Sequence, residues 1–156
     1  GLLPVELFVH RNVGNLVIHS DFNCLSVLQY AVDILKIKHV IVCGHYGCGG
    51  IKAAMSPHPH GLVDNWLRHV RDMYHRQQAK IDSIAGEAER LDRLCEMNVV
   101  EQVINVGNTT IVQEAGQRGQ NLAIHGWIYD IADGLLRNMD VCVTARAELE
   151  ALQAGR

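Results

Sequence analysis

Two spacings of hydrophobic residues alternate along the chain and predict strands and helices in turn. Short apolar, β-branched-rich runs predict strands at residues 6–11, 40–43, 121–127 and 140–145. Apolar residues three or four positions apart predict helices at residues 24–36, 51–55, 63–80, 88–105, 110–117 and 147–153. Strands that alternate with helices favour an α/β domain with a mostly parallel sheet flanked by helices.

The order of these elements predicts how the sheet is connected. Residues 6–43 form strand, helix and strand, so we expect a βαβ unit with two parallel strands and a right-handed crossover. The last strand, at 140–145, follows a turn at Asp133 and Gly134 and is expected at an edge of the sheet. Because there is no internal repeat or linker, residues 1–156 are predicted to form a single domain.

The bend after the central strand carries the most informative polar residues. His45 and Cys48 lie three residues apart, between a buried strand and a short helix, with Gly47 in the turn between them. An imidazole and a thiolate on one tight turn can face a single point, and both are preferred ligands of zinc. Two ligands do not complete a zinc site. The spacing alone therefore also allows a glycine-rich turn in which the two side chains only pack.

Composition and charge narrow the function classes. Hydrophobic residues make up 48% of the 156 positions and charged residues 20%, as in globular domains. The net charge of −3 gives no indication of binding to nucleic acid or to an anionic membrane. No apolar run approaches the length of a membrane span, and the start has no signal-peptide pattern. We expect a cytoplasmic protein that binds neither nucleic acid nor membrane.

The cysteines support a reducing compartment. They are odd in number and scattered, which favours free thiols over a disulfide framework: Cys24, Cys43, Cys48, Cys95 and Cys142. Apart from Cys48, we expect them in apolar stretches, with Cys43 pointing into the core and Cys24 and Cys95 on apolar helix faces.

Several separate motifs resemble the β-class carbonic anhydrases, and most closely their proteobacterial members. The resemblance covers nearly the whole chain and rests on residues 7–13, 26–32, 44–50, 94–99 and 125–129, in the same order. It implies the fold of that family, a Zn²⁺ cofactor, and the activity of a lyase, carbonate dehydratase. The implied reaction is the reversible hydration of carbon dioxide to bicarbonate and a proton by zinc-bound hydroxide.

The resemblance also implies roles for individual residues. His45 and Cys48 match two of the family's zinc ligands, and Tyr30 matches a tyrosine of the substrate cleft. Arg11, which ends the first predicted strand, and Tyr129, just past the third, match a regulatory bicarbonate pocket found in one subgroup. We further expect backbone N–H groups around Gly49 to polarise a substrate oxygen. The family implies a homodimer or homotetramer with active sites at the dimer interface.

The sequence departs from the family at one essential place. The family's third zinc ligand and its catalytic Asp–Arg pair lie in a Cys-x-Asp-x-Arg motif on an earlier strand, and this sequence contains no such motif. No catalytic residue is therefore identified, and the pocket's tryptophan is also missing. We expect that the chain is truncated at its N-terminus and that Gly1 is not the natural start. Loss of the motif's strand would leave neighbouring strand edges exposed.

Two other functions fit the same residues. A catalytically inactive carbonic-anhydrase-like fragment, or a binding or assembly module, would keep the fold and need not bind zinc. A different α/β enzyme could use Cys48 as a nucleophile with His45 as its base, and its activity would be zinc-independent and sensitive to alkylation.

Overall fold

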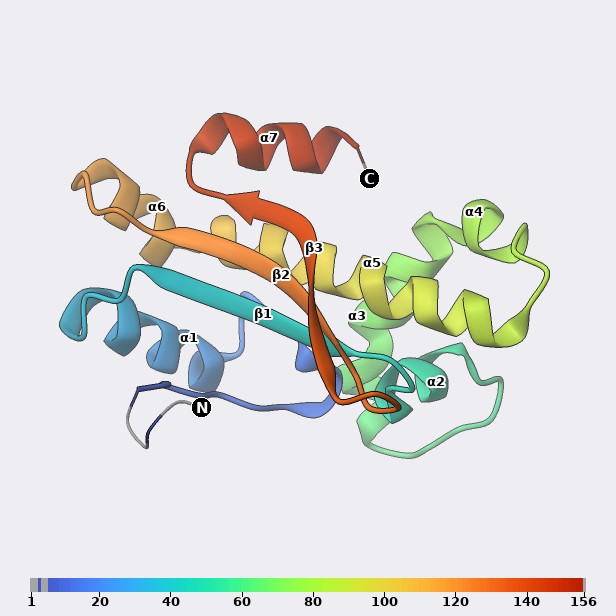
Figure 1. The fold of residues 1–156 in the computed structure, drawn as a ribbon. Coiled ribbons are helices and arrows are strands. Elements are labelled where there is room, and N and C mark those ends of the chain that lie inside the picture. The colour runs from blue at the N-terminus through green and yellow to red at the C-terminus, as the bar shows by residue number, and fades with distance from the viewer. Residues whose placement is uncertain (1–2, 4–5, 156) are drawn as a thin grey trace.

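The computed structural model describes residue 3 and residues 6–155; Gly1, the predicted start of the domain, lies outside the described residues, as do residues 2, 4, 5 and 156. The strands are β1 (His39–His45), β2 (Ala123–Asp130) and β3 (Leu135–Val143). The helices are α1 (Phe22–Gln29), α2 (Gly49–Met55), α3 (Val63–Arg76), α4 (Gln78–Asp82), α5 (Glu87–Gly107), α6 (Thr110–Gln117) and α7 (Arg146–Ala154). A 3₁₀ turn, η1 (Val13–Asn15), precedes α1, and a π-helical turn, η2 (Tyr30–Ile34), extends it (Figure 1).

The strands form one sheet in the order β1-β2-β3. β1 and β2 are parallel, in a register that pairs His39 with Ala123 and His45 with Tyr129. β3 returns antiparallel to β2 through a tight hairpin and forms one edge of the sheet. The α/β architecture and the edge strand near the C-terminus are confirmed. The predicted helix at 63–80 is divided into α3 and α4 at Gln77.

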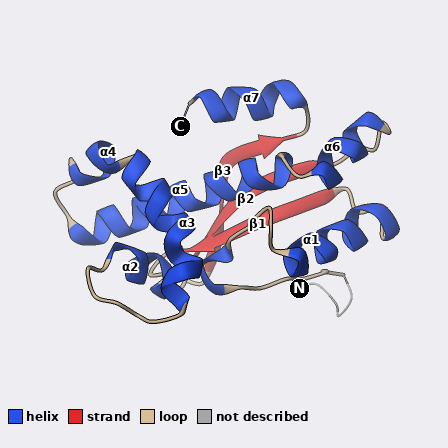
Figure 2. Cartoon of the chain, turned by 180° about the vertical axis from the view of Figure 1, so that it is seen from behind, coloured by secondary structure: helices blue, strands red, loops and turns tan. Residues whose placement is uncertain are grey.

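Helix α5 covers one face of the sheet, as Figure 2 shows from behind. Its Val99 and Val103 are fully buried, and they belong to the same core cluster as Val42 of β1 and Ile124 of β2. The backbone of β1 comes so close to α5 that a Cβ built on Gly44 would lie 2.4 Å from Val99 Cγ2. The close contact with α5 therefore holds β1 in place just before His45.

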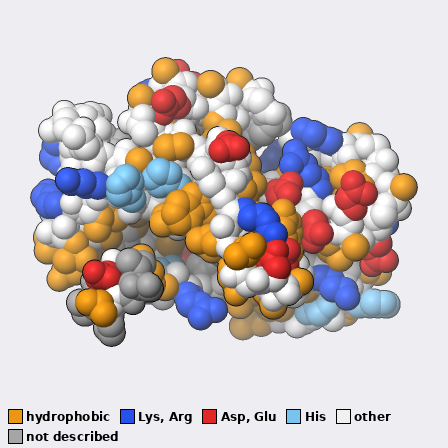
Figure 3. All heavy atoms as spheres, in the orientation of Figure 1, with side chains coloured by type: hydrophobic (Ala, Val, Ile, Leu, Met, Phe, Trp, Pro, Cys, Tyr) orange, Lys and Arg blue, Asp and Glu red, His pale blue; other side chains and the backbone are white. Residues whose placement is uncertain are grey.

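The opposite face of the sheet is open. Along β1, His39, Ile41 and Cys43 are exposed, and Figure 3 shows hydrophobic and histidine side chains at the surface of this face. The predicted burial of Cys43 is therefore wrong. Successive strand residues point to opposite faces, and Val42 and Gly44 already face α5, so Cys43 must face outwards. None of the described helices is long and apolar enough to cross a membrane.

The predicted strand at residues 6–11 is absent from the described structure. These residues form no strand, and the side chains of Leu7, Phe8 and Val9 are all more than half exposed. A strand needs a hydrogen-bonded neighbour, and within the described part of the chain β1 pairs with β2 alone. The predicted βαβ unit over residues 6–43 is therefore also wrong. The parallel pair consists of β1 and β2, and helices α2 to α6 lie between them in the sequence.

Buried amide side chains of α5 hold the loop that follows residues 6–11. Asn98 is 1% exposed and donates from Nδ2 to the carbonyl oxygen of Gly14 at 2.9 Å. Gln102 is 3% exposed, donates to Asn98 Oδ1 at 3.0 Å, and accepts the N–H of Val17 at 2.8 Å. Buried polar groups need such partners, so these hydrogen bonds determine the path of the loop without a strand ladder.

Candidate metal centre

The turn between β1 and α2 presents His45 and Cys48, as the sequence predicts. His45 is the last residue of β1 and is half-buried, while Cys48 directly precedes α2 and is 4% exposed. Gly47 has a φ of 68°, a left-handed conformation that a side chain would disfavour. The N–H of Tyr46 donates to the carbonyl oxygen of Tyr129 at 3.0 Å, which attaches the turn to the end of β2.

The donor atoms of this turn suit zinc in kind but not in number. A catalytic zinc site uses three protein ligands and an open position, and imidazole and thiolate are both suitable. Among the described residues, no third His, Cys, Asp or Glu forms a group with His45 and Cys48 in which all ligand atoms lie within 4.8 Å of one another. The described residues therefore supply two ligands of an incomplete set.

Cys95 lies beside the turn, but among the described residues its thiol forms no ligand group with His45 and Cys48. It is 3% exposed on α5, as predicted for an apolar helix face. Burial raises the pKa of the Cys95 thiol to about 12, and the backbone N–H of Cys48 offsets only part of that effect. In the absence of a metal, burial therefore favours the neutral thiol of Cys95.

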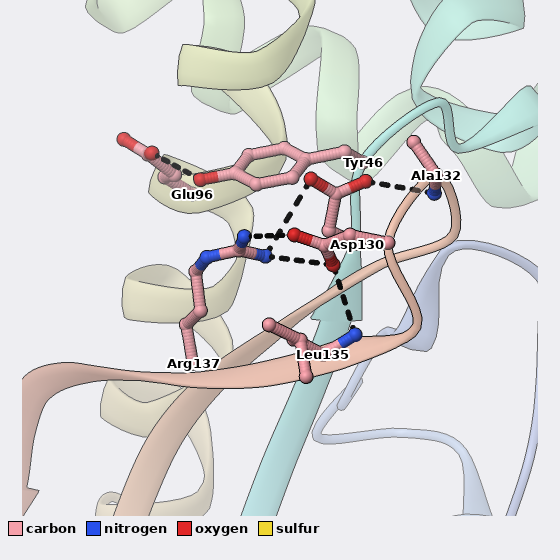
Figure 4. Close-up of polar contacts among 7 residues, drawn as sticks. Tyr46, Glu96, Asp130, Ala132, Leu135 and Arg137 are labelled. Carbon is pink, nitrogen blue, oxygen red and sulfur yellow. Dashed lines mark hydrogen bonds and ion pairs between the residues drawn. The ribbon is translucent and has the colours of Figure 1, made fainter.

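A polar network ties the turn to α5 (Figure 4). The hydroxyl of Tyr46 donates to Glu96 Oε1 at 2.7 Å. Burial, followed by this hydrogen bond and the charge of Glu96, raises the pKa of Tyr46 to about 12. The phenol therefore stays protonated at neutral pH and acts as a fixed donor. The sequence analysis did not predict this role for Tyr46. The feature that could have indicated it is that Tyr46 directly follows His45 in the sequence.

A second set of polar contacts, beside Tyr46, closes the hairpin between β2 and β3 (Figure 4). Arg137 lies 3.5 Å from Asp130 Oδ2 and forms an ion pair with Asp133. The N–H of Ala132 donates to Asp130 Oδ1 at 2.9 Å, and the N–H of Leu135 donates to Asp133 Oδ1 at 2.9 Å. These contacts hold the hairpin closed beside Tyr46, at the end of the sheet where the candidate ligands lie.

The remaining predicted site residues are more dispersed. Gly49 is the first residue of α2, and apart from its chain neighbours and the backbone of its own helix, no heavy atom of the described residues lies within 4 Å of where its Cβ would be. Tyr30 is half-exposed, with its ring centroid 5.8 Å from that of Phe8. Tyr129 lies within β2 rather than just past a strand, and pairs in register with His45.

Arg11 is exposed and makes no hydrogen bond or ion pair with any residue in the described part of the chain. The interactions described for Tyr129 do not connect it to Arg11. Tyr129 thus contacts the turn that carries His45 and Cys48, but among the described residues it makes no contact that links it to Arg11.

Comparison with known proteins decides the family. The sequence profile of the family described as carbonic anhydrase matches residues 1–136. A β-carbonic anhydrase from Coccomyxa, solved in complex with acetazolamide, superposes with a TM-score of 0.89 at 41% identity, over 97% of this chain and 71% of that one. The chain belongs to the β-carbonic anhydrase family.

Relatives within the β-carbonic anhydrase family come from fungi and bacteria. A carbonic anhydrase of Emericella nidulans is 42% identical over 141 residues, which cover 90% of this chain and 62% of that protein. One of Pseudomonas aeruginosa is 35% identical over 147 residues, covering 88% of this chain and 64% of that protein. Both kinds of organism contribute matches, so the proteobacterial subtype stays a prediction.

A structure of tetrameric β-carbonic anhydrases from Sordaria macrospora superposes with a TM-score of 0.85 at 34% identity, over 91% of this chain and 72% of that one. The chain therefore shares the fold of β-carbonic anhydrases over 71% and 72% of the two solved chains, and it spans 62% and 64% of the length of its E. nidulans and P. aeruginosa relatives.

Proposed function

We propose that the protein catalyses the reversible hydration of carbon dioxide to bicarbonate and a proton, using zinc held in part by His45 and Cys48. The observation that carries this proposal is the turn after β1, which presents an imidazole and a thiol within a β-carbonic anhydrase fold. Relatives at 42% and 35% identity are named carbonic anhydrases, which supports the same chemistry for this chain.

Each part of the turn has a role in the proposed reaction. Zinc bound there would supply a Lewis acid that lowers the pKa of water to about 7. The hydrogen bonds from Tyr46 to Glu96 and to the Tyr129 carbonyl would keep the two ligands in place. The unobstructed space at Gly49 would let a backbone N–H approach a substrate oxygen, and the half-exposed Tyr30 would line the substrate cleft.

The proposal requires a third protein ligand in addition to His45 and Cys48, because three is the number that catalytic zinc sites use. No cluster of His, Cys, Asp or Glu side chains among the described residues supplies this third ligand beside His45 and Cys48. The other proposed enzyme, with Cys48 as nucleophile, gains no support from the geometry. Within the described part of the chain, no hydrogen bond joins the Cys48 thiol to His45.

The activity and the source of the third ligand can be tested together. We expect the product of the complete reading frame to hydrate carbon dioxide in a stopped-flow assay, to lose this activity to a chelator, and to regain it with Zn²⁺. Absence of activity in the zinc-loaded protein would contradict the proposal and favour an inactive binding or assembly module. Activity of a product of 17.3 kDa would place the third ligand within these 156 residues, whereas activity that requires a longer product would place it in the added residues.

We also propose that the protein self-associates as a homodimer or homotetramer. The open face of the sheet exposes Ile41 and Tyr129 by more than a third, and the adjoining hairpin exposes Leu135 and Leu136 by about half. Exposed apolar surface of this kind marks interaction sites, and the related proteins of S. macrospora are tetrameric. Sedimentation velocity should show at least a dimer, and a monomer at micromolar concentration would contradict this proposal.

We propose a bicarbonate-binding role for Arg11, with Tyr129 as its partner in the pocket. Because Arg11 is exposed and unpaired within the described residues, its guanidinium is free to bind an anion through two hydrogen bonds. We expect Arg11→Ala to weaken inhibition by bicarbonate about tenfold, whereas Arg68→Ala, at another exposed arginine, leaves it unchanged. Equal inhibition constants for wild type and Arg11→Ala would exclude this role.

A cytoplasmic location remains our proposal, supported by five free cysteines. Cell fractionation that recovers the protein outside the cytoplasm would contradict it.

A further inference from the structure

Three metal-ligating side chains meet at the start of α1, apart from the candidate zinc turn. They are His10, from the loop before η1, Asp21, which caps α1, and Cys24, in the first turn of that helix. One ligand atom of each lies within 4.8 Å of the other two, and among the described residues this is the group of three that meets that limit. The group contains neither His45 nor Cys48.

The state of each side chain is compatible with a bound cation. Nε2 of His10 is buried and has no hydrogen-bond partner among the described residues, which is costly for an imidazole nitrogen unless a ligand satisfies it. Asp21 Oδ1 accepts the N–H of Asn23 at 3.1 Å, which orients the carboxylate and leaves its second oxygen available. Cys24 is 7% exposed and is a free thiol.

The donor types indicate which metals would bind. Nitrogen, sulfur and oxygen from His, Cys and Asp together suit zinc and its spectroscopic substitute cobalt, whereas Mg²⁺ and Ca²⁺ take oxygen ligands. We propose that His10, Asp21 and Cys24 form a second metal site that binds Zn²⁺ or Co²⁺ and leaves a fourth position for water.

Little movement would be needed to close this site. Metal–ligand distances of about 2.0–2.3 Å in a tetrahedron place ligand atoms roughly 3.5 Å apart. The three ligand atoms lie within 4.8 Å of one another, so no separation needs to shrink by more than about 1.3 Å. Residues 6–12 take no part in the sheet ladder, so His10 can shift without breaking strand hydrogen bonds. Asp21 is already oriented by its helix-capping hydrogen bond.

The test uses a background that lacks the candidate zinc ligands, the double variant His45→Ala/Cys48→Ser. We expect this protein to bind one Co²⁺ in equilibrium dialysis and to show thiolate-to-cobalt charge-transfer absorption, which added Zn²⁺ removes. Adding Cys24→Ser should abolish that absorption, and adding His10→Gln or Asp21→Asn should weaken Co²⁺ binding at least about tenfold. Adding Cys142→Ser or His19→Gln, at exposed positions, should change neither the charge-transfer absorption nor the affinity for Co²⁺.

Two results would overturn the proposal: no Co²⁺ charge-transfer absorption in the double variant, or absorption that survives Cys24→Ser. If Cys24→Ser does not fold, as judged by circular dichroism, alkylation of the double variant decides instead. Zn²⁺ should then slow the reaction of Cys24 with iodoacetamide and leave Cys142 unaffected, and equal rates would exclude the site. Because the double variant already lacks His45 and Cys48, failure here would not affect the proposed hydration activity.

Discussion

We expect His45→Ala and Cys48→Ser each to lower the rate of carbon dioxide hydration by on the order of 1,000-fold or more. Each substitution removes one of two ligands on the turn after β1, and a zinc site that loses a ligand no longer retains its metal. Without the metal, the pKa of the water rises from about 7 back to that of bulk water, and the nucleophile is lost at neutral pH. Stopped-flow rates and zinc content on the same samples measure both effects.

Matched controls separate metal loss from general damage. His69→Ala changes an exposed histidine of α3, and Cys142→Ser changes an exposed cysteine of β3, and both should keep wild-type zinc content and rate. Zinc content unchanged from wild type in either His45→Ala or Cys48→Ser would show that the altered residue is not a ligand. The assignment of this turn as the zinc site would then be wrong.

We expect Gly44→Ala to lower the free energy of unfolding by about 3 kcal/mol, the upper end of the usual cost of overpacking. The added Cβ would lie 2.4 Å from Val99 Cγ2, far inside van der Waals contact. Val99 is fully buried on α5, and a β-branched residue in a helix has little rotamer freedom with which to move aside. Urea unfolding followed by circular dichroism measures the change.

Two further variants test this explanation. Gly116→Ala in α6 should instead raise stability by about 0.5–1 kcal/mol, because the built Cβ has no heavy atom of the described residues within 4 Å apart from its chain neighbours and its own helix backbone. In the double variant Gly44→Ala/Val99→Ala, the second change removes the clashing methyl, so the two costs should not add. A Gly44→Ala protein within about 0.5 kcal/mol of wild type would show that β1 is not pressed against α5.

Local pattern was sufficient for most of the elements and for the candidate turn. The apolar run at 40–43 predicted the centre of β1, and the glycines around His45 and Cys48 predicted the bend into α2, because strand burial and left-handed turns depend on neighbouring residues. The long helical spacing at 88–105 likewise predicted α5 to within about two residues at each end. These features need no knowledge of distant contacts.

Pairing partners required the tertiary structure. Residues 6–11 have the composition of a strand, yet form none in the described structure, because a strand exists only where another strand completes its hydrogen bonds. The outward direction of Cys43 depends on which face α5 covers. The buried hydrogen bonds of Asn98 and Gln102 likewise depend on the loop that crosses α5.

The clusters of polar side chains were also decided by the fold. The distances in sequence from His10 to Asp21 and Cys24 match no motif, and these residues meet only because the loop before η1 passes the start of α1. Tyr46 reaches Glu96, fifty residues away, because α5 lies against β1. Local sequence specifies which side chains can perform the chemistry and which segments bend. Long-range packing specifies which of them come together, since those contacts join residues that the local pattern cannot relate.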